Sequence, residues 1–258
     1  MRLIASLLIC AVALHADFSY RSRISITGGE LYASLAASGK HGADPITVTK
    51  LIKGYRMAIL SHQHTTVIDV NSETITEIDY AKKNYSVIPF AMMKRALDAA
   101  EAKAVHQATF DIAPQAPSGL GKPPGILNPE EKAFRLTAPG GSIQVELDTW
   151  IGTIPGYEQL TDFNAKLASK LGWTFASGFS ELALRAPESW QALGEAARQL
   201  NQSLGAPLMT TLKITAADRL LLEGSVELTN FGGGVQENSK FDPPAGFKKV
   251  DPVLPAVP

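Results

Sequence analysis

The chain has 258 residues, of which 24 are basic and 25 are acidic, so it is close to neutral at pH 7. This balance gives no electrostatic case for nucleic-acid binding, which normally needs a basic patch or stripe, and little case for an anionic membrane surface. The one cysteine is Cys10.

Residues 1–16 have the pattern of a secretory signal peptide. Arg2 supplies the positive charge, residues 3–14 are mainly apolar, and Ala16 provides a small residue for cleavage before Asp17. The apolar run is too short to span a bilayer, which takes about 20 residues. We expect export to the periplasm or outside the cell, with no transmembrane segment after cleavage. Because Cys10 leaves with the leader, the mature chain has no thiol for a disulfide, a metal or a nucleophile.

A series of strands follows the leader. Apolar and polar residues alternate from Phe18 to Thr27, and Gly28-Gly29 ends the run. Residues 30–38 are compatible with a short helix. The next strands are predicted at residues 46–52, 55–61, 65–70, 74–80 and 85–88. Their connections are too short for helical crossovers, which indicates an antiparallel meander.

Amphipathic helices interrupt the strands in the second half. Pro89 begins one helical pattern, which continues to about residue 104, and others cover 157–171 and 187–204. Residues 113–129 are rich in Pro and Gly and are predicted as a long loop. Further strands are expected at 134–137, 142–151, 208–215 and 220–229, before a Pro-rich extended tail at 242–258.

These patterns predict an α+β fold with a single domain over residues 17–241. Strands in which apolar and polar residues alternate bury only one face. We therefore expect a curved, mostly antiparallel sheet whose concave apolar face is covered by the amphipathic helices. No G-x-S-x-G elbow, H-E-x-x-H or P-loop motif occurs. We therefore expect no enzyme activity and no cofactor.

His62 and His64 are the strongest candidates for polar chemistry, since residues two apart share one side of a strand. A zinc site needs three or four converging ligands, and no further ligand motif accompanies this pair. A polar hairpin turn is the alternative interpretation. The acid pairs Glu130-Glu131 and Glu223 with Glu227 fit a solvated face.

Large apolar residues on the predicted helices and strands are candidates for a ligand cavity. Such pockets are apolar with few polar groups, and flexible methionines adapt to varied ligands. Packing in a solid core is the alternative for the same residues. The candidates are Met57, Ile59, Phe90, Met93, Leu97, Leu160, Phe163, Leu167, Trp173 and Trp190.

Several stretches resemble a group of secreted proteins of soil bacteria such as acidobacteria, which carry a domain of unknown function. They include residues 53–57, 67–70, 73–79, 82–87 and 93–94, then 150–151, 154–157 and 244–250. The pattern of sheet and helices is similar to that of the LolA/LolB superfamily of lipoprotein carriers. This resemblance implies a half-barrel with an apolar cavity, and a lipid or lipoprotein acyl chain as partner. A structural envelope protein with a solid core and, less favoured, a hydrolase or metal-dependent enzyme using His62 and His64 are the alternatives. The oligomeric state is left open.

Overall fold

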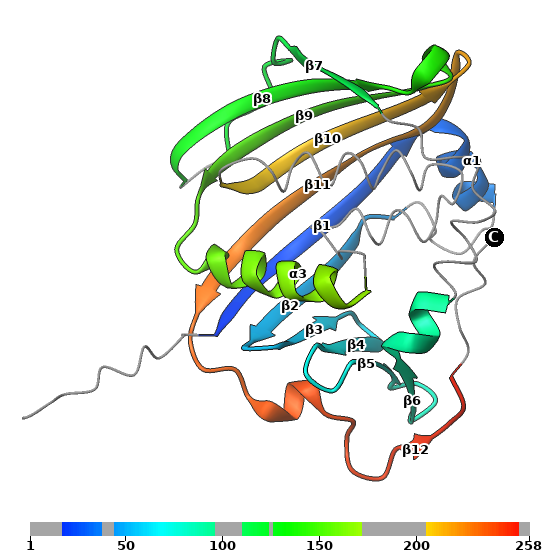
Figure 1. Cartoon of the computed structure of the whole chain (residues 1–258), viewed down its shortest axis with the longest axis vertical. Helices are drawn as coiled ribbons and strands as arrows, with labels where there is room; N and C mark the ends of the chain where they lie inside the picture. Colours follow the sequence, from blue (N-terminus) through cyan, green and yellow to red (C-terminus); the bar gives the residue numbers. More distant parts are fainter. Residues whose placement is uncertain (1–16, 38–43, 96–109, 124–125, 172–204, 253–258) are drawn as a thin grey trace, which may run out of the picture.

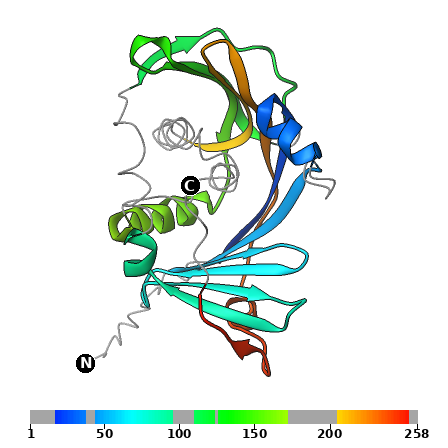
Figure 2. The ribbon, with the colours of Figure 1, turned by 90° about the vertical axis from the view of Figure 1, so that its right-hand side faces the viewer.

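The computed structural model describes residues 17–37, 44–95, 110–123, 126–171 and 205–252. Twelve strands among these residues form one unclosed sheet in the order β12-β6-β5-β4-β3-β2-β1-β11-β10-β9-β8-β7. The sheet is strongly curved, as Figure 1 and the perpendicular view in Figure 2 show. Every pairing is antiparallel except that of β12 with β6.

The first half of the sheet is the meander that the sequence predicts. The strands are β1 (Phe18–Gly28), β2 (Ile46–Lys53), β3 (Arg56–Leu60), β4 (His64–Asp69), β5 (Thr74–Asp79) and β6 (Asn84–Pro89). Their polar turns agree with the predicted boundaries to within one or two residues. A short helix, α1 (Gly29–Ala37), follows β1.

The second half is formed by β7 (Asp111–Gln115), β8 (Leu127–Thr137), β9 (Ile143–Thr153), β10 (Ala206–Ala216) and β11 (Arg219–Gly233). The first strand, β1, joins the two halves by pairing with β11. This pairing brings the start of the described chain beside the end of β11, and Gly234 N donates a hydrogen bond to Asp17 O at 3.0 Å.

The predicted loop at 113–129 differs from the structure at both ends. Its first residues belong to β7, in which Pro114 lies opposite Phe134, and its last residues belong to β8. A proline has no amide to donate, which suits an edge strand, and β7 is the outermost strand of the sheet. All five residues of β7 are exposed, so its sequence has no alternation to mark it as a strand.

The concave side bears the larger hydrophobic cluster, which receives side chains from both halves of the sheet. Helix α3 (Tyr157–Leu171) crosses this side over β1 and β2 (Figures 1 and 2). Its boundaries match the predicted helix, and its buried residues are Leu160, Phe163, Asn164, Leu167 and Leu171. Residues 90–95 are also helical. The expected helix at 187–204 lies outside the described residues, so a complete helical cover of the concave face stays a prediction.

The convex side of β2–β6 is apolar as well, which the alternation did not predict. Leu51, Ala58, Val67 and Ile78 form a second cluster with Phe241. Phe241 ends a short helix, η3 (Asn238–Phe241), and the following chain reaches β12 (Lys248–Lys249). The C-terminal segment 234–250 therefore covers the outer face of the β2–β6 half. On the other half, the outer face carries paired charges such as Arg135 and Glu146, 3.0 Å apart.

Candidate functional site

Two neighbouring rows of side chains give the concave face its chemical character. The first, called here the apolar row, takes one residue from each strand from β1 to β6, and each lies directly opposite the next in the strand register. Its members are no more than 2% exposed. They are Phe18, Ile52, Met57, Ile68, Ile75 and Ile88.

The second row lies two residues further along each strand and is called here the polar row. It consists of Tyr20, Lys50, Ile59, Thr66, Glu77 and Ser86. Because strand residues two apart point to the same face, both rows face the concave side. An unbroken apolar strip therefore runs beside a strip with hydroxyl, ammonium and carboxyl groups.

Lys50 is fully buried in the polar row, next to Tyr20. Its Nζ lies 5.9 Å from the centroid of the Tyr20 ring, within the range of a cation–π contact. Thr66 Oγ1 donates a hydrogen bond to Glu77 Oε2 at 2.9 Å. Burial raises the pKa of Glu77 to about 7, and the hydrogen bond from Thr66 offsets part of that rise. This carboxyl is therefore partly protonated near neutral pH.

Helix α3 begins against the end of the apolar row. The Tyr157 ring meets the Phe18 ring edge to face, with centroids 6.3 Å apart. The preceding Gly156 has a φ of +86°, and a Cβ there would lie 3.0 Å from the Phe18 ring. Burial raises the pKa of the Tyr157 phenol, and the nearby Tyr20 raises it further. Tyr157 is therefore a neutral hydroxyl beside the polar row.

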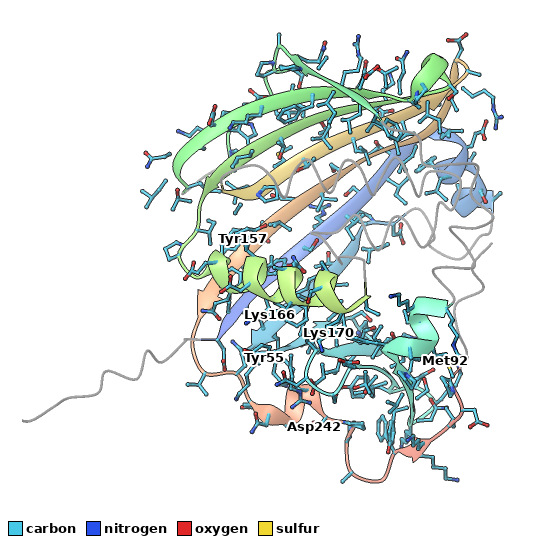
Figure 3. The ribbon with its side chains drawn as sticks, viewed as in Figure 1. Tyr55, Met92, Tyr157, Lys166, Lys170 and Asp242 are labelled. Carbon is cyan, nitrogen blue, oxygen red and sulfur yellow. The ribbon has the colours of Figure 1, made fainter. Side chains whose placement is uncertain are left out.

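The opposite flank of α3 is held at the hairpin turns. Lys166 Nζ lies 4.1 Å from the centroid of the Tyr55 ring in the β2–β3 turn. Lys170 Nζ pairs with Glu73 Oε1 in the β4–β5 turn at 2.6 Å. Figure 3 shows Tyr55, Lys166 and Lys170 on this side of the helix. The helix thus lies lengthwise over the apolar row, along the ends of the strands.

Two buried polar atoms on the concave side have no hydrogen-bond partner within the described part of the chain. They are Ser22 Oγ on β1 and Asn164 Oδ1 on α3. Ser22 is 0% exposed and Asn164 is 8% exposed. Neither residue is among the site residues that the sequence predicts. The sequence did indicate burial at both positions. Ser22 shares one side of its strand with Tyr20 and Ile24, and Asn164 lies within the apolar stripe of its helix.

The structure brings seven of the ten predicted cavity residues into one cluster. Met57, Phe90, Leu160, Phe163 and Leu167 are buried there, and Ile59 and Met93 pack against it partly buried. Met92, labelled in Figure 3, also packs against this cluster and is partly buried. The other three candidates, Leu97, Trp173 and Trp190, lie outside the described residues.

His62 and His64 are both exposed at the turn that leads into β4. The turn is held locally, because Ser61 Oγ donates a hydrogen bond to His64 O at 2.9 Å. Asp79 lies opposite His64 in the strand register. Within the described ranges, no three His, Cys, Asp or Glu side chains converge as a metal site would require. The geometry of these two residues fits the polar-turn interpretation.

Comparisons with known proteins show a similarity in structure. No family model matches the chain, and no curated protein matches it. Among solved structures it is similar to a LolA superfamily protein from Nitrosomonas europaea, at 10% sequence identity and a TM-score of 0.29. The match covers 89% of this chain and 91% of the other. No helix among the described residues is long and apolar enough to cross a membrane.

Proposed function

We propose that this protein is an exported, non-enzymatic binding protein that holds a lipid or another apolar ligand on the concave face of its sheet. The observation behind the proposal is the pairing of the apolar row with the polar row on one buried face. Ligand sites of this kind are mainly apolar and contain a few placed polar groups that orient the ligand. A long acyl chain would lie along the apolar row, beneath α3.

The proposal includes the LolA-like half-barrel that the sequence resemblance implies, with amphipathic helices closing the concave face. It also includes the leader, since removal of residues 1–16 would deliver the protein to the periplasm or the outside of the cell. Carriage of a lipoprotein acyl chain is the more specific form of this function. The adaptable side chains of Met57, Met92 and Met93 at the cluster support it.

A protein with a solid core is the second candidate. Met57 and Leu167 are both 0% exposed, as expected of residues that pack against each other without a ligand. Such a protein would serve the cell envelope through its outer surface. The two candidates differ in whether purified protein takes up an apolar molecule.

Uptake of the neutral fluorescent probe N-phenyl-1-naphthylamine separates these functions. Met93 is partly buried against the concave cluster, so Met93→Asp should abolish the probe signal by placing a charge there. Ala91 is exposed on the same helical segment, and Ala91→Asp is the matched control with the same change in charge. Circular dichroism should show both variants folded.

Native mass spectrometry of the exported protein gives a second, independent measurement. A co-purified mass that disappears on organic extraction would support ligand carriage. Wild-type protein that binds neither the probe nor an endogenous molecule would overturn the proposal in favour of the solid core. Equal probe uptake by the two Asp variants would exclude residues 90–95 from the ligand site.

A further inference from the structure

The two buried polar atoms without partners are unusual for a folded chain. More than nine in ten buried polar groups have a hydrogen-bond partner, because leaving one unsatisfied is costly. Within the described residues, Ser22 Oγ and Asn164 Oδ1 both lack one, while their side chains are at least nine-tenths buried. They belong to β1 and α3, two elements that pack against each other. Both therefore call for a hydrogen-bonding group that is not part of the described chain.

The helix geometry indicates which way Asn164 points. At 100° per residue, Lys166 and Lys170 lie on one side of the buried stripe that Phe163 and Leu167 define, and Asn164 lies on the other. The two lysines meet the hairpin turns at Tyr55 and Glu73. Asn164 is consequently turned away from the strand ends and toward the middle of the concave face.

Tyr157 lies on the same flank of α3 as Asn164, because positions seven residues apart are about 20° apart around a helix. Its phenol interacts electrostatically with Tyr20 in the polar row. Ser22 is the next concave-facing residue after Tyr20 on β1, opposite Val48 and Leu228. This flank of α3 and this part of β1 both face the concave interior.

We infer that Ser22 and Asn164 form a subsite for the polar head of a neutral amphiphile that carries a free hydroxyl, such as a monoacylglycerol. The inference rests on the proposed function and specifies its ligand. An amide oxygen only accepts hydrogen bonds, so Asn164 Oδ1 requires a donor from the ligand. The Ser22 hydroxyl both donates and accepts, and suits a second hydroxyl of the ligand. A carboxylate or an alkyl ester without hydroxyls would leave Asn164 Oδ1 unsatisfied.

Competition for bound N-phenyl-1-naphthylamine on the purified mature protein tests this inference. The competitors are monoolein, methyl oleate and oleate, which share one acyl chain and differ in the head. Monoolein should displace the probe at a concentration about tenfold below that of methyl oleate. One hydrogen bond to a buried acceptor changes the binding affinity by about tenfold. Oleate should resemble or fall below methyl oleate.

Ser22→Ala and Asn164→Leu remove the two polar groups while keeping the surroundings apolar. Each should weaken monoolein binding toward the level of methyl oleate, and leave methyl oleate binding unchanged. Ser25→Ala, on the outer face of the same strand, is the control and should behave as wild type. Thermal melting should show all three variants folded, because an apolar side chain replaces no existing hydrogen bond at Ser22 or Asn164.

The possible failures are distinguishable. If no probe and no oleoyl compound binds, the proposed function itself is wrong. If monoolein and methyl oleate bind equally, or if the preference for monoolein survives both substitutions, ligand binding stands and the hydroxyl subsite is wrong. If oleate binds best, the head-group class is anionic and the inference is overturned.

Discussion

The guanidinium of Arg56 lies over the ring of Phe241, with 5.2 Å between Cζ and the ring centroid. The two residues are 185 positions apart. Arg56 Nη2 also donates a hydrogen bond to Asp242 Oδ1 at 2.6 Å. This contact fixes the C-terminal segment to the β2–β3 hairpin, on the face of the sheet opposite to α3. The β2–β6 half is consequently buried on both faces.

Phe241→Ala should destabilise the protein by about 3 kcal/mol, the usual cost of removing a buried aromatic side chain. Phe241 is 2% exposed in the outer cluster. Val235→Ala is the control, because Val235 in the same segment is 91% exposed and its loss should change stability by less than about 0.5 kcal/mol. Urea unfolding measures both. Equal stability of the two variants would contradict the role assigned to the segment.

Leu167→Ala should cost about 3 kcal/mol, whereas Lys170→Ala should cost less than about 1 kcal/mol. Leu167, on the buried side of α3, is 0% exposed, while the Lys170–Glu73 ion pair has both side chains about half exposed. The apolar stripe therefore holds the helix, and the ion pair adds little. Urea unfolding at low and high salt checks this, since only the Lys170 effect should depend on salt. A larger effect from Lys170→Ala would assign the attachment of α3 to the hairpin turns.

Much of the fold follows from periodicity in the sequence. Residues 18–27 and 142–147 alternate because one face of the strand is buried there, and the stripe of Tyr157, Leu160, Phe163, Leu167 and Leu171 marks α3 to the residue. The pairing of β1 with β11 has no such local signal. It depends on contacts between residues about 200 positions apart, which no short pattern encodes.

The candidate site is predictable in its apolar part and not in its polar part. Met57, Phe163 and Leu167 stand out as large apolar residues on regular elements, and the structure buries them together. Lys50 lies on the otherwise apolar face of β2. Lysine side chains are mostly exposed in proteins, so the sequence alone predicts that Lys50 faces solvent. Its burial results from the neighbouring strands and from Tyr20 beside it. The sequence positions of Ser22 and Asn164 indicate burial, but only the tertiary structure shows that both lack a hydrogen-bond partner among the described residues.

Cleavage after Ala16 should give an exported protein whose first residue is Asp17. The fold engages this residue at once, because Gln236 N donates to Asp17 Oδ2 at 2.6 Å and Lys53 Nζ lies 3.8 Å from the same oxygen. Intact-mass measurement of protein recovered from the periplasm or medium checks the site. Ala16→Arg should block cleavage there and retain the precursor. An N-terminus at Leu14 would instead show that Ala13 precedes the cut.

Glu77 should make stability depend on pH in the direction opposite to that of an ordinary carboxylate. Its folded pKa of about 7 exceeds the ordinary value of 4.5, because burial disfavours the charge. The folded protein therefore binds more protons than the unfolded chain between these two values, and this contribution to stability falls as the pH rises from about 4.5 to about 7. The Glu77→Gln variant tests this pH dependence. Its side chain keeps an acceptor for Thr66 Oγ1 and cannot ionise, so the variant should lose this part of the pH dependence. The free energy of unfolding of the Gln variant minus that of wild type should therefore be larger at pH 8 than at pH 5. Urea unfolding at the two pH values measures the difference, and Asp111→Asn, on the exposed strand β7, serves as the control. A constant difference between the Gln variant and wild type would mean that Glu77 titrates near its ordinary pKa in the folded protein.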